Sequence, residues 1–251
     1  MYYTETDHFG WKLSSVIAIA ISIPGVYVIG RRLGGRGVGT LATSIFASSH
    51  YLFAYAHTGY NNIHAVAPSV WALAALVYGI QRRSALSLYA SGVLAGLGFY
   101  TFFSARATIA IIVVFLLTQR GLRRTISSLR PIVIGFIITA TPMFVVSRID
   151  TISVMVAEVP GGYSAAVSGP ALQRIAENAT RNLLAFNFNA DKHHYVTGSL
   201  LDPLTAVLAV LGIGLAIRHL RRPAFRLLLI WIGIGAVVTG VLSPYPGVAI
   251  S

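Results

Sequence analysis

Residues 84–118 read SALSLYASGVLAGLGFYTFFSARATIAIIVVFLLT, an apolar run in which Arg106 is the only charged side chain. A single helix of this length would measure about 50 Å at about 1.5 Å per residue, whereas the hydrocarbon core of a bilayer is roughly 30 Å thick. The run therefore predicts two membrane spans. The natural division is the polar interruption YTFFSAR at 100–106.

The composition of the whole chain is that of an integral membrane protein. Of its 251 residues, 55% are hydrophobic and 10% are charged, and the mean hydropathy is +0.73. Such a chain lacks the polar surface that a water-soluble domain needs. The sequence contains no cysteine, which excludes disulfide and thiolate chemistry.

Similar apolar runs elsewhere predict an all-α fold, a polytopic transmembrane helix bundle of about eight spans. Helices are expected because lipid leaves unpaired backbone groups unsatisfied, and the runs lack the alternation of barrel strands. We expect one membrane-embedded domain over residues 1–251. The predicted spans are 13–30, 37–56, 63–80, 85–103, 105–118, 131–147, 203–217 and 225–243.

The charges predict the orientation of this bundle, because short cytoplasmic loops collect Lys and Arg. With the N-terminus outside, most of the 19 basic residues fall on inner turns, and all seven acidic residues lie outside. The net charge of +12 is thus an orientation signal, and nucleic acid is not an expected partner. We expect the protein in the cytoplasmic membrane of a prokaryote. The inner residues are Arg31, Arg32, Arg36, Arg82, Arg83, Arg120, Arg123, Arg124, Arg130, Arg218, Arg221, Arg222 and Arg226.

One long segment, 148–202, is expected to fold outside the membrane. Its middle, 170–186, has apolar and polar residues on opposite faces of a helical pattern, which predicts an amphipathic extracytoplasmic helix. The helix either rests on the spans or acts as a lid over a substrate. Downstream, His193 lies in a dense polar cluster, for which sugar hydrogen bonding is favoured over metal binding because no third spaced ligand accompanies it.

The candidate site residues gather at the outer ends of the spans. The stretch YAHTGYNNIH at 55–64 holds no Lys or Arg, and its imidazole, amide and phenol groups suit a hydroxylated substrate. Arg106 lies at the outer boundary, where its guanidinium contacts either lipid headgroups or an anionic group of the substrate. The stretch supplies donors and acceptors for the substrate at one level, namely His57, Tyr60, Asn61, Asn62 and His64.

Three stretches resemble the membrane core of GT-C glycosyltransferases, in particular the family 39 protein mannosyltransferase and aminoarabinose transferase group. They are GRRLGGRGVG at 30–39, SSHYLFAYAHTGYNNI at 48–63 and LAGLGFYTFFSAR at 94–106. LDPL at 201–204, Trp231 and LSPYP at 242–246 are also similar. The chain departs from the group at His57, where many relatives have Arg, so phosphate contact at this position is in question.

The resemblance implies a transferase that moves a sugar from a polyprenyl-phosphate carrier to a glycan, lipid or protein acceptor at the extracytoplasmic face. It implies no cofactor, and we expect no metal. It also implies an acidic base in the first outer loop, which would precede Met1. Asp7 is the candidate within the chain, although it also fits an exposed polar tail.

We therefore expect the chain to be a fragment, incomplete at both ends and inactive alone. The alternative functions are a polytopic transporter or permease and a non-catalytic membrane assembly subunit. A transporter is disfavoured because no predicted span carries the Asp or Glu that ion-coupled carriers place near the midplane.

Overall fold

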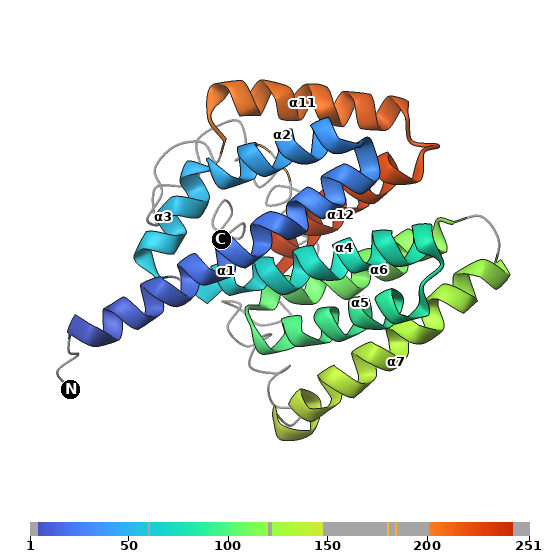
Figure 1. The fold of residues 1–251 in the computed structure, drawn as a ribbon, viewed down its shortest axis with the longest axis horizontal. Coiled ribbons are helices and arrows are strands. Elements are labelled where there is room, and N and C mark those ends of the chain that lie inside the picture. Colours follow the sequence, from blue (N-terminus) through green and yellow to red (C-terminus); the bar gives the residue numbers. More distant parts are fainter. Residues whose placement is uncertain are drawn as a thin grey trace, which may run out of the picture.

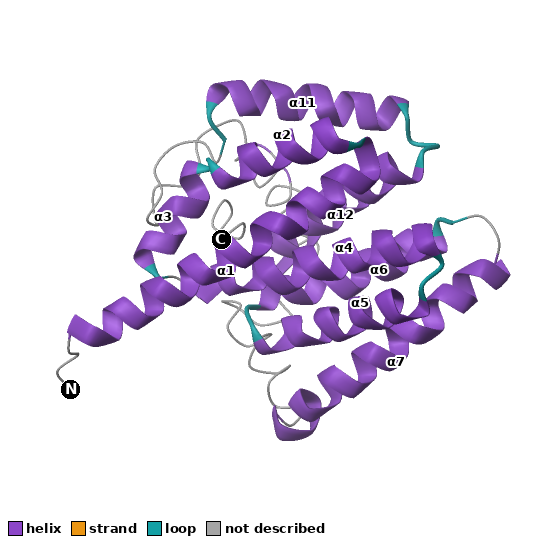
Figure 2. Cartoon of the chain, in the orientation of Figure 1, coloured by secondary structure: helices purple, strands orange, loops and turns teal. Residues whose placement is uncertain are grey.

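The computed structural model describes residues 5–59, 61–119, 122–147 and 201–242, together with the isolated positions 180 and 184. Every regular element within these residues is a helix, which confirms the all-α prediction (Figure 2). The α-helices are α1 (Glu5–Gly34), α2 (Arg36–Ala47), α3 (His50–Thr58), α4 (Val66–Arg82), α5 (Ala85–Leu97), α6 (Ala107–Leu117), α7 (Leu122–Ser147), α11 (Pro203–Arg218) and α12 (Pro223–Leu242). The short 3₁₀ helices are η1 (Asn61–Ala65), η2 (Gly98–Tyr100) and η3 (Phe103–Arg106).

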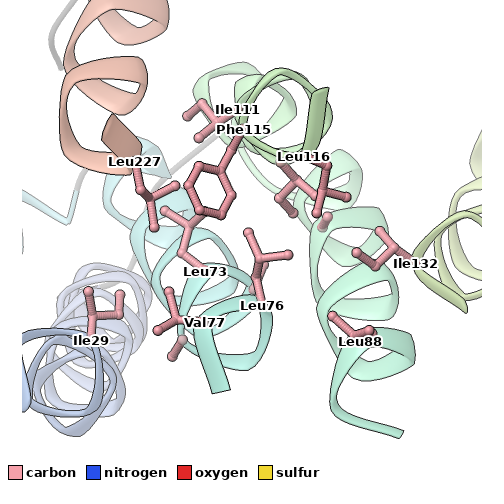
Figure 3. Close-up of a cluster of buried hydrophobic side chains, with 14 of the residues drawn as sticks. Ile29, Leu73, Leu76, Val77, Leu88, Ile111, Phe115, Leu116, Ile132 and Leu227 are labelled. Atoms are coloured by element: carbon pink, nitrogen blue, oxygen red, sulfur yellow. The ribbon is translucent and has the colours of Figure 1, made fainter. Parts of the chain in front are cut away.

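The helices form a bundle in which the chain repeatedly reverses direction (Figure 1). α1 packs against α2 and α4, α5 lies between α4 and α7, and α6 packs against α12. The core surrounds α4, where Leu73 and Leu76 are buried among Ile29 of α1, Phe115 of α6 and Leu227 of α12 (Figure 3). α4 is thus the central helix, which explains why its sequence is apolar on all sides.

The outer surface of the bundle is apolar as well. Leu86, Val145 and Leu204 are each at least 71% exposed, which fits contact with lipid rather than with water. Three helices, Phe9–Gly34, Asn62–Arg82 and Thr125–Val145, are long and apolar enough to cross a membrane, and several others are shorter but apolar. The protein is therefore an integral membrane protein, while the total of eight spans stays a prediction.

The division of the run 84–118 is confirmed. α5 ends at Leu97 and α6 begins at Ala107, with η2 and η3 forming the turn between them. The turn is tight because a Cβ on Gly98 would lie 3.0 Å from the Cβ of Ala105. The Thr101 hydroxyl also donates a 2.9 Å hydrogen bond to the carbonyl oxygen of Gly98.

The continuous helix predicted over 37–56 is wrong, because α2 ends at Ala47 and α3 begins at His50. Ser49 is extended, with φ −64° and ψ 116°, and the Ser48 hydroxyl donates to the carbonyl oxygen of Ser44 at 2.8 Å. Such local side-chain bonds compete with the helix ladder. The break lets α3 turn back toward α1 (Figure 1). Tyr55 of α3 is buried, and the partly buried Tyr51 packs against the same small cluster.

α7 also differs from its prediction, since it begins at Leu122 rather than at residue 131. It packs against α5 through small residues: Gly92 and Gly96 have the i, i+4 spacing of close helix contacts. An added Cβ on Gly92 would collide with the carbonyl oxygen of Ile132, and one on Gly135 would collide with the carbonyl oxygen of Tyr89. The two backbones are therefore nearly in contact.

Asp202 caps α11, and its carboxylate accepts a 3.0 Å hydrogen bond from the Thr205 backbone N–H. Hydrogen bonds from the Thr205 side chain and backbone lower the pKa of Asp202. A lowered folded-state pKa means that the cap stabilises the helix above the unfolded-state pKa and is lost as the pH falls through the folded one.

We expect amide protection factors in the first turn of α11 to fall below about pH 4, the ordinary range of an aspartate. Hydrogen exchange followed by mass spectrometry measures this loss. The Asp202→Asn variant is the control, because asparagine caps a helix but does not titrate. The same pH dependence in that variant would show that another group is responsible.

Candidate functional site

A cavity of about 290 Å³ opens at the end of the bundle where α3 ends and α6 begins. Six elements contribute to it: α3, η1, α4, η3, the start of α6, and α12. The lining residues are Tyr51, Leu52, Tyr55, Asn62, Ile63, Ala65, Val66, Ser69, Val70, Ser104, Ala107, Thr108, Ile111, Trp231 and Gly235. The walls are mostly apolar and aromatic with a few polar groups, which is the usual composition of a small-molecule site.

Asn62 contributes a buried carboxamide group to this cavity. Gly59 ends α3 in the left-handed conformation at φ 71°, which glycine adopts without strain, and the chain then turns into η1. The Asn62 side chain is only 7% exposed, yet its carboxamide oxygen has no hydrogen-bond partner among the described residues. Buried polar atoms are almost always paired in native proteins, so this oxygen is suited to accept a hydrogen bond from a ligand.

A pair of hydroxyl groups lies in the same cavity. The Thr108 hydroxyl of α6 donates a 2.8 Å hydrogen bond to the Ser69 hydroxyl of α4, which in turn donates to the carbonyl oxygen of Ala65 at 2.7 Å. Thr108 is 2% exposed. Both hydroxyl protons are therefore used in these hydrogen bonds, and the remaining lone pairs on the two oxygens can accept further ones. The pair offers the cavity further acceptor sites for a ligand with hydroxyl groups.

Aromatic side chains form other parts of the wall. The rings of Tyr51 and Tyr55 lie 4.6 Å apart between centroids, and Trp231 approaches from α12. Aromatic faces next to hydrogen-bond acceptors match a molecule that has both C–H faces and hydroxyl groups. A monosaccharide has this combination.

Arg106 lies beside the cavity and not in its lining. Its guanidinium carbon is 5.5 Å from the centroid of the Phe99 ring, within the range of a cation–π contact. Phe99 is held in turn against Phe136 of α7, with the ring centroids 5.3 Å apart. Ser104, two residues before Arg106, and Ala107, the next residue after it, both line the cavity. The Arg106 guanidinium and part of the cavity wall are thus supplied by the same short segment of the chain.

The other predicted site residues are not brought together in the cavity. His57 is exposed near the end of α3. His64 directs its Nε2 atom to the Ser14 hydroxyl of α1 at 3.1 Å, which is a contact between helices. Tyr60, His193 and the side chains of Asp7 and Asn61 lie outside the described part. Within the described part no group of three potential metal ligands occurs.

The main polar groups of the cavity had only partial sequence signals. Asn62 belongs to the polar stretch 55–64, where the sequence does not distinguish it from the other candidate contacts. Ser69 and Thr108 sit inside apolar segments, where a single hydroxyl residue is common. Only their pairing across two helices distinguishes them, and that pairing is a tertiary feature.

The fold and the cavity define an integral membrane protein of helical bundle type with a small polar site at one end of the bundle. Comparison with protein families gives a match to the family described as dolichyl-phosphate-mannose-protein mannosyltransferase over residues 4–147, more than half of the chain. The chain belongs to this family, and the matched region contains Asn62, Ser69, Arg106 and Thr108. No curated protein and no solved structure gives a significant match.

Membership confirms the resemblance to GT-C glycosyltransferases and makes a membrane glycosyltransferase the function class of this chain. It also favours the enzyme over the two alternatives, a transporter and an assembly subunit.

Proposed function

We propose that this protein takes part in transferring a sugar from a polyprenyl-phosphate carrier to an acceptor hydroxyl at the extracytoplasmic face of a prokaryotic cytoplasmic membrane. In this reaction the bond between the anomeric carbon and the phosphate oxygen breaks, and its electron pair stays with the phosphate. A bond from the acceptor oxygen to the anomeric carbon forms, and the acceptor proton passes to a carboxylate base. Asp7, in the first turn of α1, is the candidate for this base within the chain.

The observation that carries the proposal is the buried, unpartnered carboxamide oxygen of Asn62 in a cavity of sugar size. A sugar hydroxyl donating to this oxygen would satisfy it, and the Ser69–Thr108 pair would accept from a second hydroxyl. The Trp231 and Tyr55 rings would cover the apolar faces of the sugar. We therefore assign the cavity to the sugar.

Arg106 is the candidate partner of the carrier phosphate. An arginine beside a cavity can hold a phosphate with two parallel hydrogen bonds, and its charge stabilises the negative charge that develops as the phosphate departs. The aromatic contact with Phe99 orients the guanidinium without neutralising it. The polyprenyl chain would lie against the apolar outer surface and remain in lipid.

The charge distribution supports the extracytoplasmic assignment. Among the described turns, those at the other end of the bundle carry Arg31, Arg32, Arg82, Arg83, Arg221 and Arg222. Basic turns of this kind mark the cytoplasmic side of membrane proteins. The described acidic positions fall at the starts of α1 and α11, at the opposite ends of those helices from Arg32 and Arg218.

The Arg106→Ala variant is expected to bind the mannosyl-phosphoryl form of a short polyprenol roughly 10- to 100-fold more weakly than the unmodified chain, because it loses charge-assisted hydrogen bonds to the phosphate. Titration of the purified chain in detergent, followed by intrinsic tryptophan fluorescence, measures the affinity. Binding does not require the catalytic base, so this assay does not depend on turnover.

Arg36→Ala is the matched control, because Arg36 is exposed at the start of α2 and is not part of the cavity wall. It should bind the carrier with unchanged affinity. If Arg106→Ala binds as tightly as the unmodified chain while melting at the same temperature, Arg106 does not hold the phosphate. If the unmodified chain shows no preference for the sugar-bearing carrier over a neutral polyprenol, the proposed function is wrong for this cavity.

A further inference from the structure

A second pocket, of about 380 Å³, lies at the other end of the bundle, between the last turns of α1, α4 and α6 and the first turn of α12. It is separate from the proposed sugar site and shares no lining residue with it. The lining residues are Arg32, Leu33, Val77, Ile80, Gln81, Phe115, Gln119, Pro223 and Ala224. Polar side chains and apolar side chains contribute to the same pocket.

Arg32 lines this pocket, and a second arginine, Arg226, contacts the lining residue Gln119. The guanidinium carbon of Arg32 lies 4.5 Å from the centroid of the Tyr78 ring, so the side chain is held in place without an anion. Arg226, in the first turn of α12, donates to the Gln119 side-chain oxygen over a long distance of 3.5 Å. The buried Nε atom of Arg226 has no hydrogen-bond partner among the described residues.

No described carboxylate is available to pair with these arginines. The described acidic positions are Glu5 and Asp7, at the start of α1, and Asp202, at the start of α11. Glu5 and Asp7 lie at the end of α1 that is opposite to the pocket. Asp202 lies at the end of α11 that is opposite to the turn between α11 and α12. Further described arginines lie at the ends of α1, α4 and α11 or in the turns that follow α4 and α11, on the same end of the bundle, and add positive charge there, namely Arg31, Arg82, Arg83, Arg218, Arg221 and Arg222. The local charge therefore favours an anion.

The amide groups around the pocket are already oriented. Gln81 donates from its side-chain nitrogen to the carbonyl oxygen of Arg32 at 2.9 Å, and Gln119 donates to the carbonyl oxygen of Phe115 at 3.4 Å. These bonds tie α4 to α1 and fix Gln119 against α6. Two of the lining side chains are therefore held by hydrogen bonds to the backbone.

We propose that this pocket binds the phosphate headgroup of an anionic membrane lipid. The two guanidinium groups bind the phosphodiester, while Leu33, Val77, Ile80 and Phe115 supply an apolar wall for the glycerol backbone and the start of an acyl chain. A free phosphate would use the arginines but leave this wall without a partner. A basic pocket between transmembrane helices suits a lipid headgroup because it offers positive charge to the phosphate beside an apolar wall.

The test uses the full chain in detergent, with native mass spectrometry to measure the binding of phosphatidylglycerol and of phosphatidylcholine. We expect tighter binding of phosphatidylglycerol, and about a tenfold loss of its affinity in Arg226→Gln, because a charge-assisted contact is removed. Arg32→Gln should show a similar loss. Arg82→Gln is the matched control, since Arg82 is exposed at the same end and is not a lining residue, whereas Arg32 lines the pocket and Arg226 is bonded to the lining residue Gln119.

A loss of affinity in Arg226→Gln or Arg32→Gln, with little change in Arg82→Gln and unchanged melting temperatures, supports the proposal. Equal losses in all three variants would indicate only a general attraction of anions to this end, and would overturn it. A competition with inorganic phosphate separates the two sources of the anion. Binding of inorganic phosphate that depends on Arg226, without any preference for phosphatidylglycerol over phosphatidylcholine, would overturn the lipid assignment.

Discussion

A leucine at position 92 is expected to prevent α5 and α7 from packing, and to lower the free energy of unfolding by about 3 kcal/mol or more. Even the first carbon of an added side chain would collide with the backbone carbonyl of Ile132. A backbone atom in a helix cannot rotate away as a side chain can, so the helices must separate. Separation would also disturb the 2.8 Å hydrogen bond from the Ser91 hydroxyl to the carbonyl oxygen of Ala72.

Thermal unfolding of the purified chain in detergent, together with size-exclusion chromatography, measures this effect. Gly212→Leu is the matched control, since Gly212 lies in α11 and a Cβ there meets no atom within 4 Å. The control should change stability by no more than about 1 kcal/mol, the scale of helix propensity differences. If Gly92→Leu and Gly212→Leu melt alike, the close approach of α5 and α7 is not a feature of the folded protein.

Much of the fold follows from the sequence, because the bilayer restricts the solutions available to an apolar chain. The division of 84–118 could be predicted since one helix of that length does not fit a membrane. The interruption at Ser48–Ser49 could not, because serine is tolerated inside helices and only the extended conformation of Ser49 reveals the break. Likewise, the early start of α7 is hidden by its basic first turn, which has the composition of a loop.

The candidate site was less accessible from the sequence. The polar stretch 55–64 supplies part of the cavity wall, but polarity alone does not separate His64, which contacts α1, from Asn62, which lines the cavity. The Ser69–Thr108 contact joins residues 39 positions apart, and no spacing rule relates them. Sites built across several helices depend on packing that a single sequence does not display.

The Asn62→Leu variant is expected to lose sugar binding without losing stability. Leucine has a similar size and shape, and the replaced carboxamide oxygen is buried with no partner among the described residues. Removing an unsatisfied buried polar atom is neutral or stabilising, whereas removing an acceptor of a ligand hydroxyl weakens binding roughly 10- to 100-fold. The melting temperature in detergent should therefore stay level or rise while the affinity for the mannosyl-phosphoryl polyprenol falls.

Thr108→Val provides the contrast, because it removes a hydroxyl that is already bonded to Ser69 and should lower stability by about 1 kcal/mol. A second comparison uses polyprenyl phosphate without a sugar. Asn62→Leu should bind this ligand normally if the carboxamide contacts the sugar, whereas Arg106→Ala should bind it weakly if the guanidinium contacts the phosphate. Equal weakening of both ligands by Asn62→Leu, or a lowered melting temperature, would mean that Asn62 supports the fold of the cavity rather than the sugar.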